Sequence, residues 1–209
     1  MDDTRTDEEL MEAYASGERG AFEVLFARLA PRLHAFFARS FGRSDAADDC
    51  LQTTFVKLHV ARGTYRTGAR LRPWVFAIAA RVRLDELRRR YRLPPTADED
   101  AIDEAVHVPA TGHAEAAERA ELATRVRAAV EALPESQRVV VLLHRFEGLT
   151  FGEIGEALGV SEGAVRIRAF RAYDSLRAKL EDLVDLERRA SSEPAMAREP
   201  SARDARKAR

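Results

Sequence analysis

Residues 150–173 combine arginines with large apolar side chains in a pattern that suits contact with DNA. A short apolar segment ends at Gly159, and Ser161 is placed to cap the helix that follows. This order of helix, tight turn and second helix is the layout of a helix-turn-helix. In that motif the second helix enters the major groove with its N-terminal half. The segment therefore predicts contacts that read duplex DNA.

The second helix of this motif has two unlike faces when its residues are placed at about 100° intervals. One face, which must be buried, consists of Val165, Ala169, Ala172 and Leu176. The opposite face carries Ile167 and Phe170, with Arg166 and Arg171 beside them. Exposed apolar residues between arginines suit thymine methyl groups and phosphates. The alternative is an ordinary helical hairpin whose arginines are solvated.

A second group of aromatic and basic residues lies on a predicted helix that begins near Pro73. One stripe of that helix carries Trp74, Arg81, Asp85, Arg88 and Arg92. The preceding loop adds Tyr65, Arg66 and Arg70. An aromatic ring among arginines can stack on an unpaired base and follow a phosphate backbone. A tryptophan at helical spacing also occurs in ordinary cores, so this stripe alone leaves both interpretations open.

The rest of the chain predicts helices that position these two groups. Apolar residues recur at helical spacing from Leu10 to Leu58, and Pro73 suits the first turn of a long helix. Thr6 and Glu9 predict a capping box, and Pro31 is expected to kink or restart the second helix. The predicted fold class is therefore all-α: two small helical domains joined by a flexible acidic linker, the second a helix-turn-helix domain.

Charge divides the 209-residue chain into four segments, although its net charge is only −1. Residues 1–93 carry 17 basic and 13 acidic side chains, whereas 94–118 carry 7 acidic side chains and no basic one. Residues 119–186 carry 10 basic and 11 acidic side chains, and 187–209 carry 7 and 4. This division predicts a domain, a flexible acidic linker, a second domain and a disordered basic tail.

The composition argues against several classes of protein. The N-terminus is acidic and polar, so we expect no secretory signal, and no apolar segment is long enough to cross a membrane. Cys50 is the single cysteine, which excludes an internal disulfide and a cysteine-clustered zinc site. The five histidines share no metal-ligand spacing, and no catalytic motif stands out. We expect a cytoplasmic protein that is not an enzyme and uses no metal or cofactor.

Taken in order, these segments resemble the bacterial sigma-70 family of RNA polymerase sigma factors, in its compact extracytoplasmic-function form. The similarity covers about residues 7–180. Residues 45–56 resemble the family's polymerase-binding helix, and 72–89 resemble the segment that melts the promoter and reads its minus-10 element. Residues 133–138 and the helix-turn-helix resemble the domain that reads the minus-35 element.

The resemblance implies a role for each group of residues. The minus-35 duplex would be contacted by Ser161, Glu162, Arg166, Ile167, Arg168, Phe170 and Arg171. The minus-10 strand would be contacted by Tyr65, Arg66, Arg70, Trp74, Arg81, Asp85 and Arg88, and polymerase by Asp48, Asp49, Gln52 and Phe55. Two positions depart from the family pattern. Thr53 replaces an acidic residue of the polymerase-binding helix, and Arg81 replaces an asparagine of the melting helix.

The same resemblance assigns the four segments and their partners. It implies a region 2-like domain (1–93), the acidic linker (94–118), a region 4-like domain (119–186) and the basic tail (187–209). Core RNA polymerase would bind through the clamp helices of its largest subunit and the flap of the second largest, together with promoter DNA and an anti-sigma protein. The alternatives are a conventional helix-turn-helix regulator that works without polymerase and a small helical adaptor with no DNA role.

Overall fold

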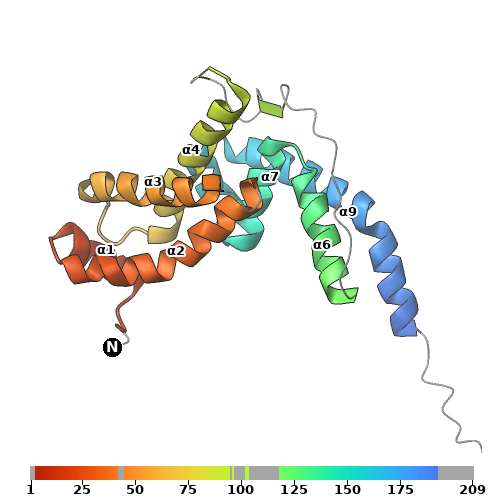
Figure 1. Cartoon of the computed structure of the whole chain (residues 1–209), viewed down its shortest axis with the longest axis horizontal. Helices are drawn as coiled ribbons and strands as arrows, with labels where there is room; N and C mark the ends of the chain where they lie inside the picture. Colours follow the sequence, from red (N-terminus) through yellow and green to blue (C-terminus); the bar gives the residue numbers. More distant parts are fainter. Residues whose placement is uncertain (1–2, 42–44, 95, 97–101, 104–117, 193–209) are drawn as a thin grey trace, which may run out of the picture.

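A computed structural model describes residues 3–41, 45–94, 96, 102–103 and 118–192 of the chain. All regular elements within these ranges are helical, which confirms the predicted all-α class (Figure 1). None of the described helices is both long enough and apolar enough to cross a bilayer.

The first half of the chain folds into a series of α-helices that pack on their neighbours. They are α1 (Asp7–Ala15), α2 (Arg19–Phe41), α3 (Asp45–Ala61) and α4 (Leu71–Tyr91). A single 3-10 turn, η1 (Arg62–Thr64), begins the loop between α3 and α4. Helix α1 packs on α2, α2 on α3, and α3 on α4, so each helix has its sequence neighbour beside it (Figure 1).

Local signals set the boundaries of these helices. Thr6 and Glu9 form the predicted capping box, in which the Glu9 N–H donates to the Thr6 hydroxyl and the Thr6 N–H donates to the Glu9 carboxylate. Pro73 lies in the first turn of α4, where its missing N–H costs nothing. Helix α2 does not restart at Pro31 but continues through it. The buried side chains on both sides of the proline, such as Leu33, hold the helix in place.

The second half of the chain contains the helix-turn-helix. Its elements are α6 (Glu118–Glu131), α7 (Glu135–Val141), a π-helical turn η2 (Leu142–Phe146), α8 (Phe151–Leu158) and α9 (Glu162–Ser192). Thr150 and Glu153 form a capping box at the start of α8, and Gly159 ends that helix with a φ of +73°. The Ala164 N–H donates to the Ser161 hydroxyl at 3.2 Å, so Ser161 caps α9 as predicted.

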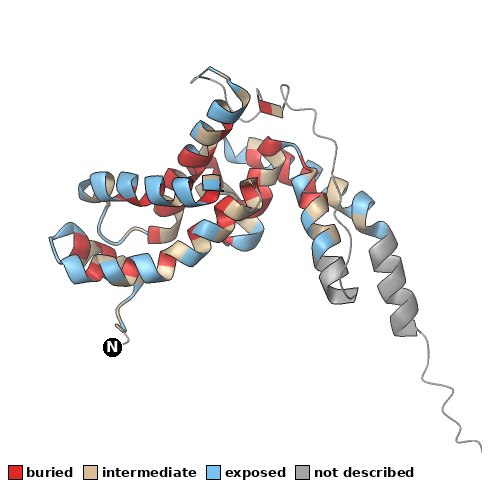
Figure 2. Cartoon of the chain, in the orientation of Figure 1, coloured by how far each residue is buried: buried red, intermediate tan, exposed pale blue. Residues whose placement is uncertain are grey.

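The two halves pack against each other and share one apolar core. The core joins Leu33 and Phe76 of the first half to Val139 and Ile154 of the second. Helix α8 packs against α4, and α6 contacts α2. Figure 2 shows the buried residues along the inner sides of the helices, with exposed residues on their outer sides. This contact was not predicted, because helical periodicity does not report which helices meet.

Charged side chains also cross the boundary between the halves. Arg83 on α4 is fully buried and its guanidinium forms an ion pair with Glu135 at the start of α7. Arg83 Nε–H also donates to the Ser40 hydroxyl at 3.2 Å. Arg32 of α2 lies 3.3 Å from the buried carboxylate of Glu147. Burial raises the pKa of Glu147, while Arg32 opposes that shift. Arginines of the first half therefore hold two carboxylates of the second.

The predicted acidic linker (94–118) is docked at residues 102 and 103, two of the few linker residues that the structure describes. Ile102 is fully buried. The carboxylate of Asp103 accepts hydrogen bonds from the backbone N–H of Ser136, at 3.3 Å, and from its hydroxyl, at 2.5 Å. The predicted flexible linker is therefore anchored at these two residues, where an apolar side chain enters the core. The stretch 104–117 lies outside the described residues.

The last helix is longer than the sequence predicted. A disordered tail was expected over 187–209, but residues 187–192 are the final turns of α9. This part of the chain is rich in alanine, arginine and glutamate, which are good helix formers. The prediction is therefore wrong for 187–192, and the remaining 193–209 lie outside the described residues.

Candidate nucleic-acid interface

Helix α9 presents the two faces that were predicted for it. Val165, Ala169 and Ala172 are buried against the core, whereas Ile167 is 54% exposed and Phe170 is 73% exposed. Large apolar side chains grouped on an exposed face are typical of a surface that binds a partner. Within the described part of the chain, the outer face of α9 is therefore free of protein contacts that would prevent it from entering a DNA groove.

A close contact between α8 and α9 fixes the geometry of the turn that joins them. The Val160 N–H donates to the Gly155 carbonyl at 2.9 Å. A Cβ at position 155 would lie 2.8 Å from the Val160 carbonyl oxygen, closer than real Cβ contacts allow. Only glycine fits at position 155, so the angle between the two helices of the motif depends on this residue.

Two exposed arginines border the apolar pair on α9. Arg166 lies 2.5 Å from the Glu162 carboxylate one turn earlier, and its guanidinium lies 5.5 Å from the ring centroid of Phe151. Arg171 and Ile167 line a groove of about 310 Å³ between α7 and α9. Arginine can reach both phosphates and base edges. The outward face thus combines the cations and apolar groups that duplex recognition needs.

Two members of the predicted duplex-reading group have other positions. Arg168 is only 9% exposed, so its side chain lies on the inner side of α9. The Ser161 hydroxyl is already engaged as the helix cap. Their contribution is therefore to the packing and start of α9, while the exposed residues between them face outward.

The loop before α4 carries the second predicted group. The rings of Tyr65 and Trp74 meet edge to face with centroids 5.3 Å apart, and both side chains are half-buried against the core. The Tyr65 hydroxyl donates to the Ala69 carbonyl. Burial, with two nearby carboxylates, raises the pKa of Tyr65 to about 12, so the hydroxyl stays a donor at neutral pH. Arg66 and Arg70 are exposed on the same loop.

The predicted stripe on α4 is partly engaged in ion pairs. Lys57 and Arg88 each donate to the carboxylate of Asp85 at 3.1 Å. Arg81 is exposed and lines a gap of about 100 Å³ between α4 and α8. The exposed cations of the stripe are therefore Arg81 and, at the end of α4, Arg92, whereas Arg88 is only partly exposed. A single strand could follow cations placed in this way.

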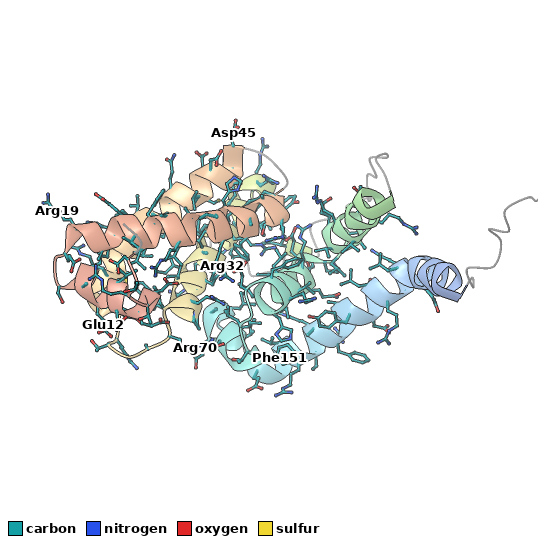
Figure 3. The ribbon with its side chains drawn as sticks, turned by 90° about the horizontal axis from the view of Figure 1, so that it is seen from below. Glu12, Arg19, Arg32, Asp45, Arg70 and Phe151 are labelled. Atoms are coloured by element: carbon teal, nitrogen blue, oxygen red, sulfur yellow. The ribbon has the colours of Figure 1, made fainter. Side chains whose placement is uncertain are left out.

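One ion pair brings the two predicted DNA-binding groups together. Arg70, in the loop before α4, lies 2.5 Å from the carboxylate of Glu153 on α8. Figure 3 shows Arg70 close to the end of α8 where Phe151 begins the helix. A residue predicted to bind the minus-10 strand therefore contacts the first helix of the helix-turn-helix.

Two of the four predicted polymerase-binding residues line a groove between α3 and α4. Asp49, Gln52, Thr53 and Val56 line this groove, which has a volume of about 710 Å³. Val56 is 63% exposed, and most of the residues that line the groove with it are polar or charged. An exposed apolar group with a polar rim is typical of a protein-binding surface. The groove therefore suits another protein better than a small ligand.

The other two residues of that group differ in exposure. Asp48 is exposed and lies 3.4 Å from the imidazole of His34. Phe55 is buried, and its ring centroid lies 4.6 Å from that of the exposed Phe26. Phe55 therefore packs beneath the exposed Phe26 rather than forming part of the surface itself. Sequence reasoning missed two exposed apolar residues near this surface. Phe26 was placed by its spacing on the inward face of its helix, and the only signal of Val60 was an apolar residue off the predicted inward face.

Two protein-family models and several sequence relatives match this chain. The family model "Sigma-70 region 2" matches residues 25–93, and "Sigma-70, region 4" matches residues 123–176. The chain is 38% identical over 173 residues to the RNA polymerase sigma factor CarQ of Myxococcus xanthus, covering 83% of this chain and 97% of CarQ. It is 32% identical over 180 residues to the ECF RNA polymerase sigma factor SigM of Mycobacterium tuberculosis, covering 86% and 85%.

Solved structures are similar as well. The structure of CnrH in complex with the cytosolic domain of CnrY matches with a TM-score of 0.57 and 28% identity, covering 87% of this chain and 98% of CnrH. The sigma factor RpoE, solved with the anti-sigma factor NepR from Bartonella quintana, matches with a TM-score of 0.60 and 22% identity, covering 77% and 96%, which shows a shared fold. With its helix-turn-helix and its relatives, this chain belongs to the extracytoplasmic-function branch of the sigma-70 family of RNA polymerase sigma factors.

Proposed function

We propose that this chain directs core RNA polymerase to specific promoters and starts transcription by reading the minus-35 duplex and capturing the melted minus-10 strand. The observation that carries the proposal is the exposed face of α9, where Ile167 and Phe170 lie between arginines at the tip of a helix-turn-helix. The similarity to sigma factors over most of the chain favours this function over a conventional regulator that works without polymerase.

Duplex reading falls to the outer face of α9. Ile167 and Phe170 contact thymine methyl groups, and Arg166 and Arg171 contact base edges or phosphates. Glu162 orients the Arg166 guanidinium across one turn of helix. This division of work follows from exposure, since only outward side chains can enter the groove.

Strand capture falls to the loop before α4 and to the start of that helix. Extruding a base from a duplex costs a few kcal/mol, which stacking on an aromatic ring and phosphate contacts can offset. The half-buried rings of Tyr65 and Trp74 provide the aromatic surface, and Arg66, Arg70 and Arg81 provide the cations. Asp85 and Arg88 form an ion pair further along α4 that keeps the stripe in register.

Polymerase binding falls to the groove between α3 and α4. Asp49 and Gln52 present polar groups there, beside the exposed Val56. The exposed Asp48 lies outside the groove, next to His34 of α2. We assign this surface to the clamp helices of the largest subunit, and the second domain (119–186) to the flap of the second largest. The 25 residues of the linker (94–118) could reach at most about 80 Å when extended. Release of Ile102 and of the packed contact between the halves would therefore let the two domains act at separate promoter elements.

An anti-sigma protein is a further partner, and the cytoplasm is the place of action. CnrH and RpoE, which resemble this chain, were both solved with a protein partner. Here the exposed Val56 and Val60 give such a partner an apolar surface to cover in the absence of polymerase. Covering that groove would prevent polymerase from binding, because both partners would need the same side chains.

The test compares transcription and DNA binding with and without core polymerase. Promoters are first selected by holoenzyme from genomic fragments of the native host. We expect run-off transcripts from these promoters, and weak binding by the factor alone, because residues 119–186 have 10 basic against 11 acidic side chains and gain little from counterion release. Specific binding of nanomolar strength without polymerase, together with no run-off product, would instead identify a conventional regulator.

A further inference from the structure

The loop between α3 and α4 exposes side chains such as Arg66 and Arg70, yet its backbone is attached to α1. The Gly68 N–H donates to Glu12 Oε1 at 2.9 Å, and the Leu71 N–H donates to Glu8 Oε1 at 3.0 Å. Glu8 and Glu12 are four residues apart, so they lie on the same side of α1. Figure 3 shows Glu12 on the side of α1 that this loop passes. We call residues 62–70 the promoter loop.

The hydrogen bond from the Leu71 N–H to Glu8 caps the start of α4. The first N–H groups of a helix lack partners within the helix and are normally capped by Ser, Thr, Asp or Asn. Arg70 occupies the cap position of α4 and makes no side-chain cap bond. Glu8 supplies the acceptor from another helix, and its negative charge suits the positive end of the α4 dipole. The start of α4 is thereby fixed to α1.

The bond from Gly68 fixes the turn of the promoter loop. The Ala69 N–H donates to the Arg66 carbonyl at 3.0 Å, which closes a β-turn over residues 66–69. Gly68 has a φ of +76° at the third position of this turn, where glycine is strongly favoured. The turn leaves Arg66 and Thr67 exposed at its tip while its backbone is held from below by Glu12.

We infer that Glu8 and Glu12 are positioning residues for strand capture: they hold the promoter loop in the shape that receives the minus-10 strand. Neither carboxylate contacts DNA. Fixing the backbone before binding removes an ordering cost that a mobile loop would meet when the base arrives. The inference rests on the proposed function of the loop, and it assigns to α1 a part in promoter melting.

The experiment uses full-length protein in holoenzyme with Glu8→Ala, Glu12→Ala, Glu8→Gln and Glu12→Gln. Glu23→Ala, which removes an exposed carboxylate of α2, is the matched control. Capture is followed by fluorescence of 2-aminopurine placed in the minus-10 element. Specificity is followed by the ratio of transcription from the selected promoter to transcription from one with a substituted minus-10 base. Affinity for a minus-35 duplex and for core polymerase is measured in parallel.

We expect each alanine variant to lower the minus-10 specificity ratio about tenfold, the size of one lost hydrogen bond to a charged group. The glutamine variants should recover most of this loss, because the amide oxygen accepts the same N–H. Affinities for polymerase and minus-35 duplex should stay within about twofold of wild type. A general loss of folding would lower the specificity ratio and both affinities together.

Two results would overturn the inference. One is a wild-type specificity ratio in both alanine variants, and the other is an equal loss in minus-35 affinity, which would mean that α1 acts only on stability. Failure of the wild-type holoenzyme to transcribe at all is a distinct outcome, since it would reject the proposed function itself.

Discussion

The guanidinium of Arg83 and the carboxylate of Glu135 form a buried ion pair between helices from opposite halves of the chain. Arg138 also pairs with this carboxylate. Burial, reinforced by the charge of Arg83, lowers the pKa of Arg138 to about 10, so it is still charged at neutral pH. One carboxylate therefore pairs with two arginines, the fully buried Arg83 and the partly buried Arg138, and the contact between the halves depends on Glu135.

Replacing Glu135 should strongly destabilise the folded chain. Glu135→Ala leaves the buried charge of Arg83 without its counter-ion, a change that costs about 3–5 kcal/mol. Urea denaturation of the full chain measures the free energy of unfolding. Glu162→Ala is the control, because it removes an exposed pair with Arg166 and should cost about 0.5 kcal/mol or less. Similar losses in the two variants would mean that the pair contributes no more than a surface contact.

The roles of the two faces of α9 can be distinguished by introducing an aspartate on each face in turn. Val165→Asp puts an unpaired carboxylate in the core and should unfold the second half of the chain. Ile167→Asp puts it on the exposed face, so thermal melting should change little while minus-35 binding is lost. Circular dichroism melts and duplex binding by holoenzyme measure both effects. Wild-type melting of Val165→Asp would show that the helix faces the other way.

The arginines of α9 should differ according to their place along the helix. Arg171→Ala or Arg166→Ala should weaken minus-35 binding by holoenzyme by about 1–3 kcal/mol if the guanidinium contacts a base edge with two bonds. Arg177→Ala removes an exposed arginine further along α9 and should have little effect. Binding titrations at one fixed salt concentration make the comparison. Unchanged selectivity in both Arg166→Ala and Arg171→Ala would reject their assignment.

Cys50 provides a reporter of opening between α3 and α4. It is 4% exposed, and burial raises its pKa to about 11, so the thiolate is scarce at pH 8. Alkylation by iodoacetamide should be about 100-fold slower in the folded chain than in urea, since the thiolate is the reactive form. The rate should rise as the pH approaches the raised pKa. Equal rates in folded and unfolded protein would show that α3 and α4 separate freely enough to expose Cys50.

The parts of the fold that depend on short-range signals were predictable from the sequence. The helix-turn-helix follows from Thr150, Gly159 and Ser161, each of which acts within a few residues of its own position. The inward face of α9 follows from helical geometry alone. These predictions are confirmed because no distant partner is needed to decide them.

The parts that depend on distant partners were not predictable. Helical periodicity indicates that a side chain faces inward, but it does not identify the side chain that it meets. Arg83 was not singled out, although it is buried against Glu135 from 52 positions away. Phe55 and Arg168 were predicted to contact partners, yet both are buried. The acceptors on Glu8 and Glu12 were missed for the same reason, since their donors lie 63 and 56 residues further along the chain.

Helix α9 runs unbroken for 31 residues, from the proposed DNA-binding residues near its start to Ser192. At 1.5 Å per residue its length is about 46 Å. A rod of that length acts as a lever: a tilt of about 10° at the groove moves the far end by about 8 Å. A protein that bound the C-terminal turns of α9 would therefore reorient the residues that we propose to enter the DNA, without touching them.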